Sequence, residues 1–156
     1  MSKSLTRVKA ALEAAGLATE VREMAETTRT AADAAAAVGC AIDQIAKSIV
    51  FRDETSGEPV LFLTAGNNHV DPEKAARAAG CPLGKADAAL VRARTGFAIG
   101  GVSPVGHLHP IRSFYDPHLS DFALIWAAAG TPRHVFAIAP PDLLRVTGAQ
   151  VSDFTA

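Results

Sequence analysis

Two apolar segments joined by a short turn most constrain the fold of this chain. Residues 47–52, KSIVFR, and residues 60–65, VLFLTA, are rich in β-branched and aromatic residues, which favour strands. The residues 55–59 between them, TSGEP, have the composition of a turn. The two segments therefore predict a β-hairpin, around which the rest of the chain must be arranged.

Helical patterns lie on both sides of this hairpin. Apolar residues at spacings of three and four predict a first helix over 5–15, and an alanine-rich pattern predicts another over 30–39. Asp71-Pro72 is typical of a helix start, and a further short helix is expected over 86–94. The remaining elements expected are strands over 19–24, 111–115, 122–127, 134–138 and 150–154, and a helix over 141–147. This irregular alternation predicts an α+β domain with a mixed, largely antiparallel sheet.

Composition narrows the class of protein. With 156 residues, 49% of them hydrophobic, the chain is expected to form one domain with a packed core. A net charge of −1 gives no overall attraction to DNA or RNA, so a nucleic-acid contact would have to be local. The longest apolar run is too short to cross a membrane. Cys40 and Cys81 form no CxxC motif and are expected to be small buried residues in a reducing, cytoplasmic environment.

Lys47 is the first candidate for chemistry. Strand alternation over 47–52 places Lys47 on the same face as Ile49 and Phe51. Two interpretations stay open: a lysine at a strand end that extends into solvent, or a cation at the mouth of an apolar pocket that holds a carbonyl, carboxylate or phosphate oxygen.

Residues 97–107, FAIGGVSPVGH, form the second candidate. Glycines let a ligand approach backbone N–H groups with no Cβ in the way, and Pro104 stiffens the loop. Fixed backbone donors suit the oxyanion that forms when an ester is attacked. A tight loop between strands is the equally weighted alternative.

Other constellations are weaker. Residues 80–86, GCPLGKA, have three rather than four residues between the glycines, and Ala86 replaces the hydroxyl residue of a phosphate loop. His107 and His109 are spaced to face one side of an extended segment, which would suit a metal hydrolase. No carboxylate or cysteine nearby completes that set, so neither a metal nor another cofactor is predicted.

These motifs together resemble the YbaK/EbsC family of aminoacyl-tRNA deacylases, which includes the editing domain inserted in bacterial prolyl-tRNA synthetases. The resemblance covers residues 28–138 and rests on the lysine strand, the segment GNNHVD and the loop GGVSPVG. It implies a curved, barrel-like sheet surrounded by short helices. It also implies hydrolysis of the ester between a wrong amino acid and tRNA, usually proline tRNA, with prolyl-tRNA synthetase as a possible partner.

The resemblance also implies the site. The family's essential lysine corresponds to Lys47, and its G-x-x-x-P loop to Gly100–Pro104, so Lys47 and Gly101 are the catalytic candidates. The residues expected to bind substrate are Thr30, Ile49, Gly100, Val102, Ser103, Pro104, Gly106, His107, Ala129 and Gly130. Ala129 stands before Gly130 where the cysteine-specific branch has serine, which makes alanine or 2-aminobutyrate at least as suitable a substrate as cysteine.

The expected mechanism places little chemistry on side chains. Lys47 and backbone N–H groups around Gly101–Ser103 would hold the ester while water attacks, assisted by the neighbouring ribose hydroxyl of the terminal adenosine. A basic group in the middle of the chain is the candidate contact for tRNA phosphates. Its members are Lys74, Arg77, Lys85, Arg92 and Arg94. The alternative is a binding module of the same fold that recognises an aminoacyl group or a synthetase without hydrolysis.

Overall fold

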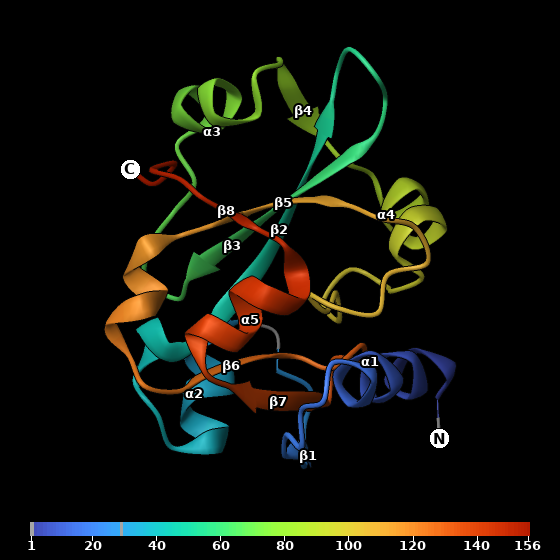
Figure 1. The fold of residues 1–156 in the computed structure, drawn as a ribbon, viewed down its shortest axis with the longest axis vertical. Coiled ribbons are helices and arrows are strands. Elements are labelled where there is room, and N and C mark those ends of the chain that lie inside the picture. Colours follow the sequence, from blue (N-terminus) through green and yellow to red (C-terminus); the bar gives the residue numbers. More distant parts are fainter. Residues whose placement is uncertain (1, 29) are drawn as a thin grey trace.

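The strands of the protein form two sheets. The computed structural model describes residues 2–28 and 30–156. The smaller sheet has the antiparallel order β1-β7-β6, and it consists of β1 (Val21–Glu23), β7 (His134–Ile138) and β6 (Ile125–Ala128). In Figure 1 it lies below the larger sheet, with α1 (Lys3–Ala14) beside it.

The larger sheet contains the predicted hairpin. Its order is β4-β2-β3-β5-β8, made of β4 (Leu83–Lys85), β2 (Ala46–Asp53), β3 (Pro59–Ala65), β5 (Arg112–Tyr115) and β8 (Gln150–Val151). The pairs β2/β3 and β2/β4 are antiparallel, and β3/β5 and β5/β8 are parallel. The fold is thus α+β with mixed, largely antiparallel pairing. The barrel-like closure is incomplete. Among the described residues, backbone pairing joins the two sheets only through a single bridge between Ile45 and Trp126.

Short helices surround the sheets. They are α2 (Ala31–Val38), α3 (Pro72–Ala79), α4 (Ala88–Thr95) and α5 (Pro140–Thr147), with 3-10 helices η1 (Ile42–Gln44) and η2 (Pro117–Asp121). The Asp71 side chain caps α3 by accepting from the N–H groups of Glu73 and Lys74, as the Asp71-Pro72 pattern predicts. In Figure 1, α5 crosses in front of the space between the two sheets.

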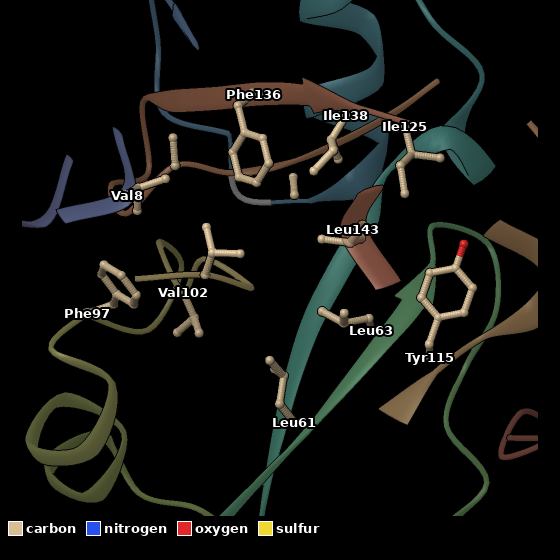
Figure 2. Close-up of a cluster of buried hydrophobic side chains, with 14 of the residues drawn as sticks. Val8, Leu61, Leu63, Phe97, Val102, Tyr115, Ile125, Phe136, Ile138 and Leu143 are labelled. Atoms are coloured by element: carbon tan, nitrogen blue, oxygen red, sulfur yellow. The ribbon is translucent and has the colours of Figure 1, made fainter. Parts of the chain in front are cut away.

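The main core fills the space between the sheets. Val8 of α1, Phe136 of β7 and Leu143 of α5 meet Leu61 and Leu63 of β3 there (Figure 2). All seven residues of β3 are buried, because a second cluster covers its other face. In that cluster Phe62 stacks on Phe114 and contacts Phe154 edge-on. The β2 alternation holds as predicted, since Ile49 and Phe51 pack on this second cluster and Val50 on the main core.

Several boundaries differ from the sequence predictions. The segment GCPLGKA contributes the short strand β4, which pairs with the end of β2. The strand expected over 122–127 begins at Ile125, and residues 122–124 form an irregular connection after η2, which Asp116 caps. The strand expected over 150–154 ends at Val151, because Phe154 turns inward to pack on Phe62. No helix within residues 2–28 and 30–156 is long and apolar enough to span a membrane.

Candidate functional site

A pocket of about 590 Å³ opens at the edge of β2 that faces the smaller sheet. Four consecutive residues of β2, 46–49, line it, because this stretch precedes the pairing with β4 at 51–53. The opposite walls come from the start of α2, from β6 and from the glycine loop. Apolar residues dominate the lining, and six of them are alanines: Ala31, Ala32, Ala34, Ala46, Ala127 and Ala128. Among the described lining residues, Lys47 is the only lysine or arginine, and none is a carboxylate.

Lys47 is held at the pocket by a backbone oxygen. Its Nζ donates a hydrogen bond to the carbonyl oxygen of Asn68 at 2.6 Å. Partial burial lowers the pKa of Lys47 below its usual value, and the nearby carboxylates of Asp116 and Asp43 oppose that effect. The ammonium group is therefore fixed in direction while it remains part of the pocket wall.

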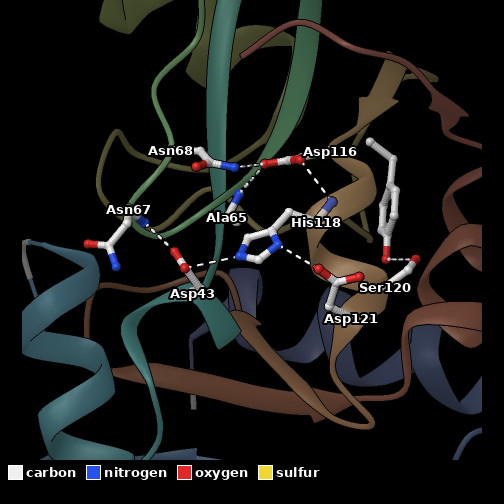
Figure 3. Close-up of polar contacts among 9 residues, drawn as sticks. Asp43, Ala65, Asn67, Asn68, Asp116, His118, Ser120 and Asp121 are labelled. Carbon is white, nitrogen blue, oxygen red and sulfur yellow. Dashed lines mark hydrogen bonds and ion pairs between the residues drawn. The ribbon is translucent and has the colours of Figure 1, made fainter. Parts of the chain in front are cut away.

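The turn that supplies this carbonyl follows β3 directly. Asn68 N–H donates to the carbonyl oxygen of Ala65 at 2.9 Å, which closes the turn. Asn67 N–H donates to Asp43 Oδ1 at 2.8 Å, and the Asn68 side-chain amide donates to Asp116 Oδ2 at 2.9 Å. Two carboxylates from distant segments thus hold the turn from both sides (Figure 3).

Asp116 is the central acceptor of this network. It is 2% exposed, and besides Asn68 it accepts from the N–H groups of Ala65 at 3.1 Å and His118 at 3.0 Å. A buried carboxylate needs such donors to offset its lost hydration. The sequence analysis did not single out Asp116. The available signal was Asp116-Pro117, the same helix-start pair as Asp71-Pro72.

His118 lies between the carboxylates of Asp43 and Asp121. Its Nδ1 is 2.8 Å from Asp121 Oδ2, and its Nε2 is 3.0 Å from Asp43 Oδ2. Hydrogen bonds of the imidazole to the carboxylates of Asp43 and Asp121 raise the pKa of His118. Burial acts to raise the pKa of Asp43, but its hydrogen bonds with Asn67 and His118 lower it overall.

The glycine loop reaches the pocket through its first residues. Gly100 and Val102 line the pocket together with the exposed Ile99. Gly100 has φ +95°, a conformation that favours glycine. At Gly101, a Cβ would lie 2.9 Å from backbone atoms of Thr131, so this residue permits close packing of two loops.

The predicted role of Gly101 as a backbone donor needs correction. Its N–H already donates to the carbonyl oxygen of Ala98 at 3.0 Å, within a tight turn. By contrast, the N–H groups of Gly100, Val102 and Ser103 have no acceptor within the described part of the chain. Any backbone donation to a ligand from this loop therefore falls to these neighbours of Gly101.

The rest of the loop is directed away from the pocket. Ser103 is fully buried, and its hydroxyl accepts from Val105 N–H at 3.2 Å. His107 Nε2 lies 2.6 Å from the Ser103 carbonyl oxygen, and burial lowers the pKa of His107. The Gly106 carbonyl accepts from Arg7 at 3.3 Å. Ser103, Pro104, Gly106 and His107 thus shape and stiffen the loop, and none of them lines the pocket.

Thr30, Ile49 and the Ala129–Gly130 pair were also expected at the substrate. Thr30 and Ile49 line the pocket, and the Thr30 hydroxyl also caps α2. Ala129 is instead buried in the main core, and Gly130 packs against the Ser4 backbone of α1. Their place in the pocket wall is taken by the preceding pair, Ala127 and Ala128. His69, which the sequence analysis did not select, also lines the pocket.

The five basic candidates for tRNA contact lie on different elements. Lys74 and Arg77 are on α3, Lys85 is on β4, and Arg92 and Arg94 are on α4. Lys74 pairs with Asp153 at 3.3 Å and Arg94 with Glu58 at 2.8 Å. Arg77, Lys85 and Arg92 are exposed. None of the five lines the pocket.

A metal centre finds no support in the described ranges. Over residues 2–28 and 30–156, no group of three or more histidine, cysteine or acidic side chains is placed to hold a metal ion. Cys40 and Cys81 are free and half-buried rather than fully buried as expected.

Comparison with known proteins agrees with this architecture. Residues 25–146 match the model of the aminoacyl-tRNA editing domain. The chain is similar, at 47% identity and a TM-score of 0.93, to the crystal structure of a candidate trans-editing enzyme for prolyl-tRNA synthetase, covering 100% of this chain and 99% of that one. It is also similar to hypothetical protein APE2540, with 28% identity, a TM-score of 0.88 and coverage of 96% and 99%. Protein YwhH of Bacillus subtilis, itself uncharacterised, is 28% identical over 85% of this chain and 83% of its own length. The chain therefore belongs to the aminoacyl-tRNA editing domain family.

Proposed function

We propose that the protein is a trans-editing deacylase that hydrolyses the ester of mischarged proline tRNA carrying a small amino acid. Alanine, 2-aminobutyrate and cysteine are the candidate residues. The observation that carries the proposal is the position of Lys47, whose ammonium group lies at the wall of an apolar pocket lined by six alanines. Such a pocket accommodates a small side chain and leaves a cation beside the ester that joins it to the tRNA.

Lys47 supplies the positive charge for the reaction. Attack on the ester carbonyl produces a tetrahedral intermediate with a negatively charged oxygen, which a fixed ammonium group stabilises. The free N–H groups of Gly100 and Val102 belong to the loop residues that line the same pocket. They are the candidate backbone donors to the ester.

Water is the proposed nucleophile. It adds to the carbonyl carbon, and the bond from that carbon to the ribose 3′ oxygen then breaks. The departing oxygen takes a proton, which the neighbouring 2′ hydroxyl can relay from the attacking water. The products are the free amino acid and tRNA with a 3′ hydroxyl. This route is consistent with a pocket lined by no carboxylate in the described chain, since a carboxylate would be the usual general base.

The wall of alanines also bears on proline, the correct amino acid. An added methylene in an apolar pocket is discriminated by only about 10- to 200-fold. Proline differs further because its nitrogen is part of a ring. Contact of that ring with the wall at Ala31, Ala127 and Ala128 is the proposed basis for excluding proline, which would protect correctly charged tRNA.

The test is deacylation of proline tRNA charged with alanine, 2-aminobutyrate, cysteine, serine or proline. The wild type should hydrolyse one or more small-residue esters and spare prolyl-tRNA. Lys47→Ala should lower the rate by about a hundredfold or more, whereas Lys9→Ala, a control on the exposed face of α1, should leave it unchanged. No hydrolysis of any ester, with or without prolyl-tRNA synthetase, would refute the proposal and favour a binding module.

Contact with tRNA is proposed through the exposed basic residues. Arg77, Lys85 and Arg92 are exposed, so they can reach phosphates without breaking the two ion pairs described above. Binding should weaken with added salt, with a slope set by a few contacts. An unchanged slope in the combined Arg77→Ala, Lys85→Ala and Arg92→Ala variant would exclude this surface.

A further inference from the structure

We infer that Asp116 is a positioning residue for Lys47, acting through the Asn68 turn and through its own charge. This inference rests on the proposed role of Lys47 in deacylation. Asp116 does not line the pocket, so it acts without touching the substrate.

The first line of support is geometric. The Lys47 ammonium bonds the Asn68 carbonyl at 2.6 Å, and the side chain of the same Asn68 bonds Asp116 at 2.9 Å. Asp116 also accepts from Ala65 N–H at 3.1 Å, at the residue where the turn begins. One buried carboxylate therefore fixes both the start of the turn and the residue whose carbonyl directs Lys47 (Figure 3).

The second line of support is burial. Asp116 is 2% exposed and is held to the end of β5 and the start of η2. Its main-chain N–H donates to the Leu63 carbonyl at 2.9 Å, which extends the β3/β5 pairing to Asp116 itself. Asp116 is thereby fixed to β3, a strand whose residues are all buried. Because the Asn68 side chain bonds Asp116, a shift of Asp116 should displace Asn68 together with its carbonyl.

The third line of support is charge. Partial burial favours the neutral form of Lys47, and the two carboxylates that oppose this effect are Asp116 and Asp43. Other titratable groups lie nearby. His118 is bonded to Asp43 and Asp121, Tyr115 lies close enough to Asp116 to feel its charge, and His69 is in the pocket wall. Removal of the Asp116 charge should therefore let Lys47 lose its proton at lower pH.

The experiment compares Asp116→Asn with Asp53→Asn. Asp53 is a matched control because it is also buried and also caps a turn, accepting from Thr55 and Ser56 N–H at 2.8 and 3.2 Å. It lies at the other end of β2 from Lys47. Both variants should lose stability, which thermal unfolding will report. Only Asp116→Asn should lower kcat, by about 10- to 100-fold, with little change in KM. Its alkaline limb of activity, corrected for spontaneous ester hydrolysis, should move to lower pH.

A second readout is independent of catalysis. Acylation of Lys47 by acetic anhydride, followed by mass spectrometry across a pH series, reports when the amine becomes neutral. Lys9, which is exposed, serves as the internal reference. Lys47 should react at lower pH in Asp116→Asn than in the wild type or in Asp53→Asn.

Asn68→Ala separates geometry from charge and serves if Asp116→Asn does not fold. It removes the side-chain bond to Asp116 but keeps the carboxylate, so kcat should fall while the alkaline limb stays in place. Equal kcat and equal Lys47 reactivity in Asp116→Asn and the wild type would overturn the inference. If Asp116→Asn does not fold, unchanged kcat in Asn68→Ala would overturn it. A wild type without deacylase activity would refute the proposed function instead, and the acylation result would still decide whether Asp116 acts on Lys47.

Discussion

Gly66 lies directly against the carbonyl oxygen of Ile42, so that a Cβ added to Gly66 would overlap this oxygen and the Ile42 side chain. Gly66 is the second residue of the turn that carries Asn67 and Asn68, and Ile42 begins η1, which carries Asp43. The close approach lets Asp43 reach Asn67 N–H at 2.8 Å. The absence of a side chain at Gly66 thus allows the turn with Asn67 and Asn68 to lie close enough to η1 for the bond to Asp43.

Gly66→Ala should therefore damage both stability and the site. The obstacle is backbone rather than a flexible side chain, so the turn must move, at a cost of about 1–3 kcal/mol. Urea unfolding will measure the loss. Gly84→Ala is the control, because the atoms nearest to its added Cβ belong to the flexible side chain of Glu54 rather than to backbone. Equal free energies of unfolding for the two variants would contradict this prediction, because they would show that the turn can shift away from Ile42 without loss of stability.

Narrowing the pocket should change which ester is hydrolysed. Ala128 is half-buried on β6 and lines the pocket, and valine is well tolerated in a strand. Ala128→Val should reduce kcat/KM for 2-aminobutyryl-tRNA about tenfold more than for alanyl-tRNA, since a methyl group of difference is worth about this much in an apolar pocket. Equal losses of kcat/KM for the two substrates would show that the amino-acid side chain of the substrate does not bind against Ala128.

The His118 cluster should make stability depend on pH. The folded-state pKa of His118 is raised by Asp43 and Asp121, so its stabilising contribution is complete below the unfolded pKa and is lost as pH rises through the folded one. Because the His118 side chain is 37% exposed, the contribution should stay within about 1 kcal/mol. The stability difference between wild type and His118→Gln should shrink from about pH 5 to about pH 9. A constant difference across that range would show that the imidazole charge contributes nothing.

The parts of the site that depend on local sequence could be predicted. Alternation along one strand places Lys47 on the same face as Ile49, and both residues line the pocket. Alternation alone left open whether Lys47 extends into solvent, and the family resemblance singled it out. The helix cap at Asp71 also follows from local sequence. These features need no knowledge of which distant segments meet.

The supporting network could not be predicted in this way. The Asn68–Asp116 bond joins residues 48 apart, and it exists because β3 and β5 pair in parallel in one particular register. The pocket wall on β6 illustrates the same limit. The prediction placed Ala129 there, but the chain leaves the strand after Ala128, so Ala129 packs into the core. A shift of one residue reverses which face a side chain occupies.

The pairing of β1 with β7 has a consequence for synthesis of the chain. Val21 pairs with Phe136, and the α1 residues Leu5, Val8 and Leu12 share a core with Leu143. β1 therefore has no strand partner until β7 has also left the ribosome. Because β6 lies beside β7, the alanine wall of the pocket forms at that same late step. A nascent chain should thus remain unable to bind an aminoacyl ester until β6 and β7 have been synthesised.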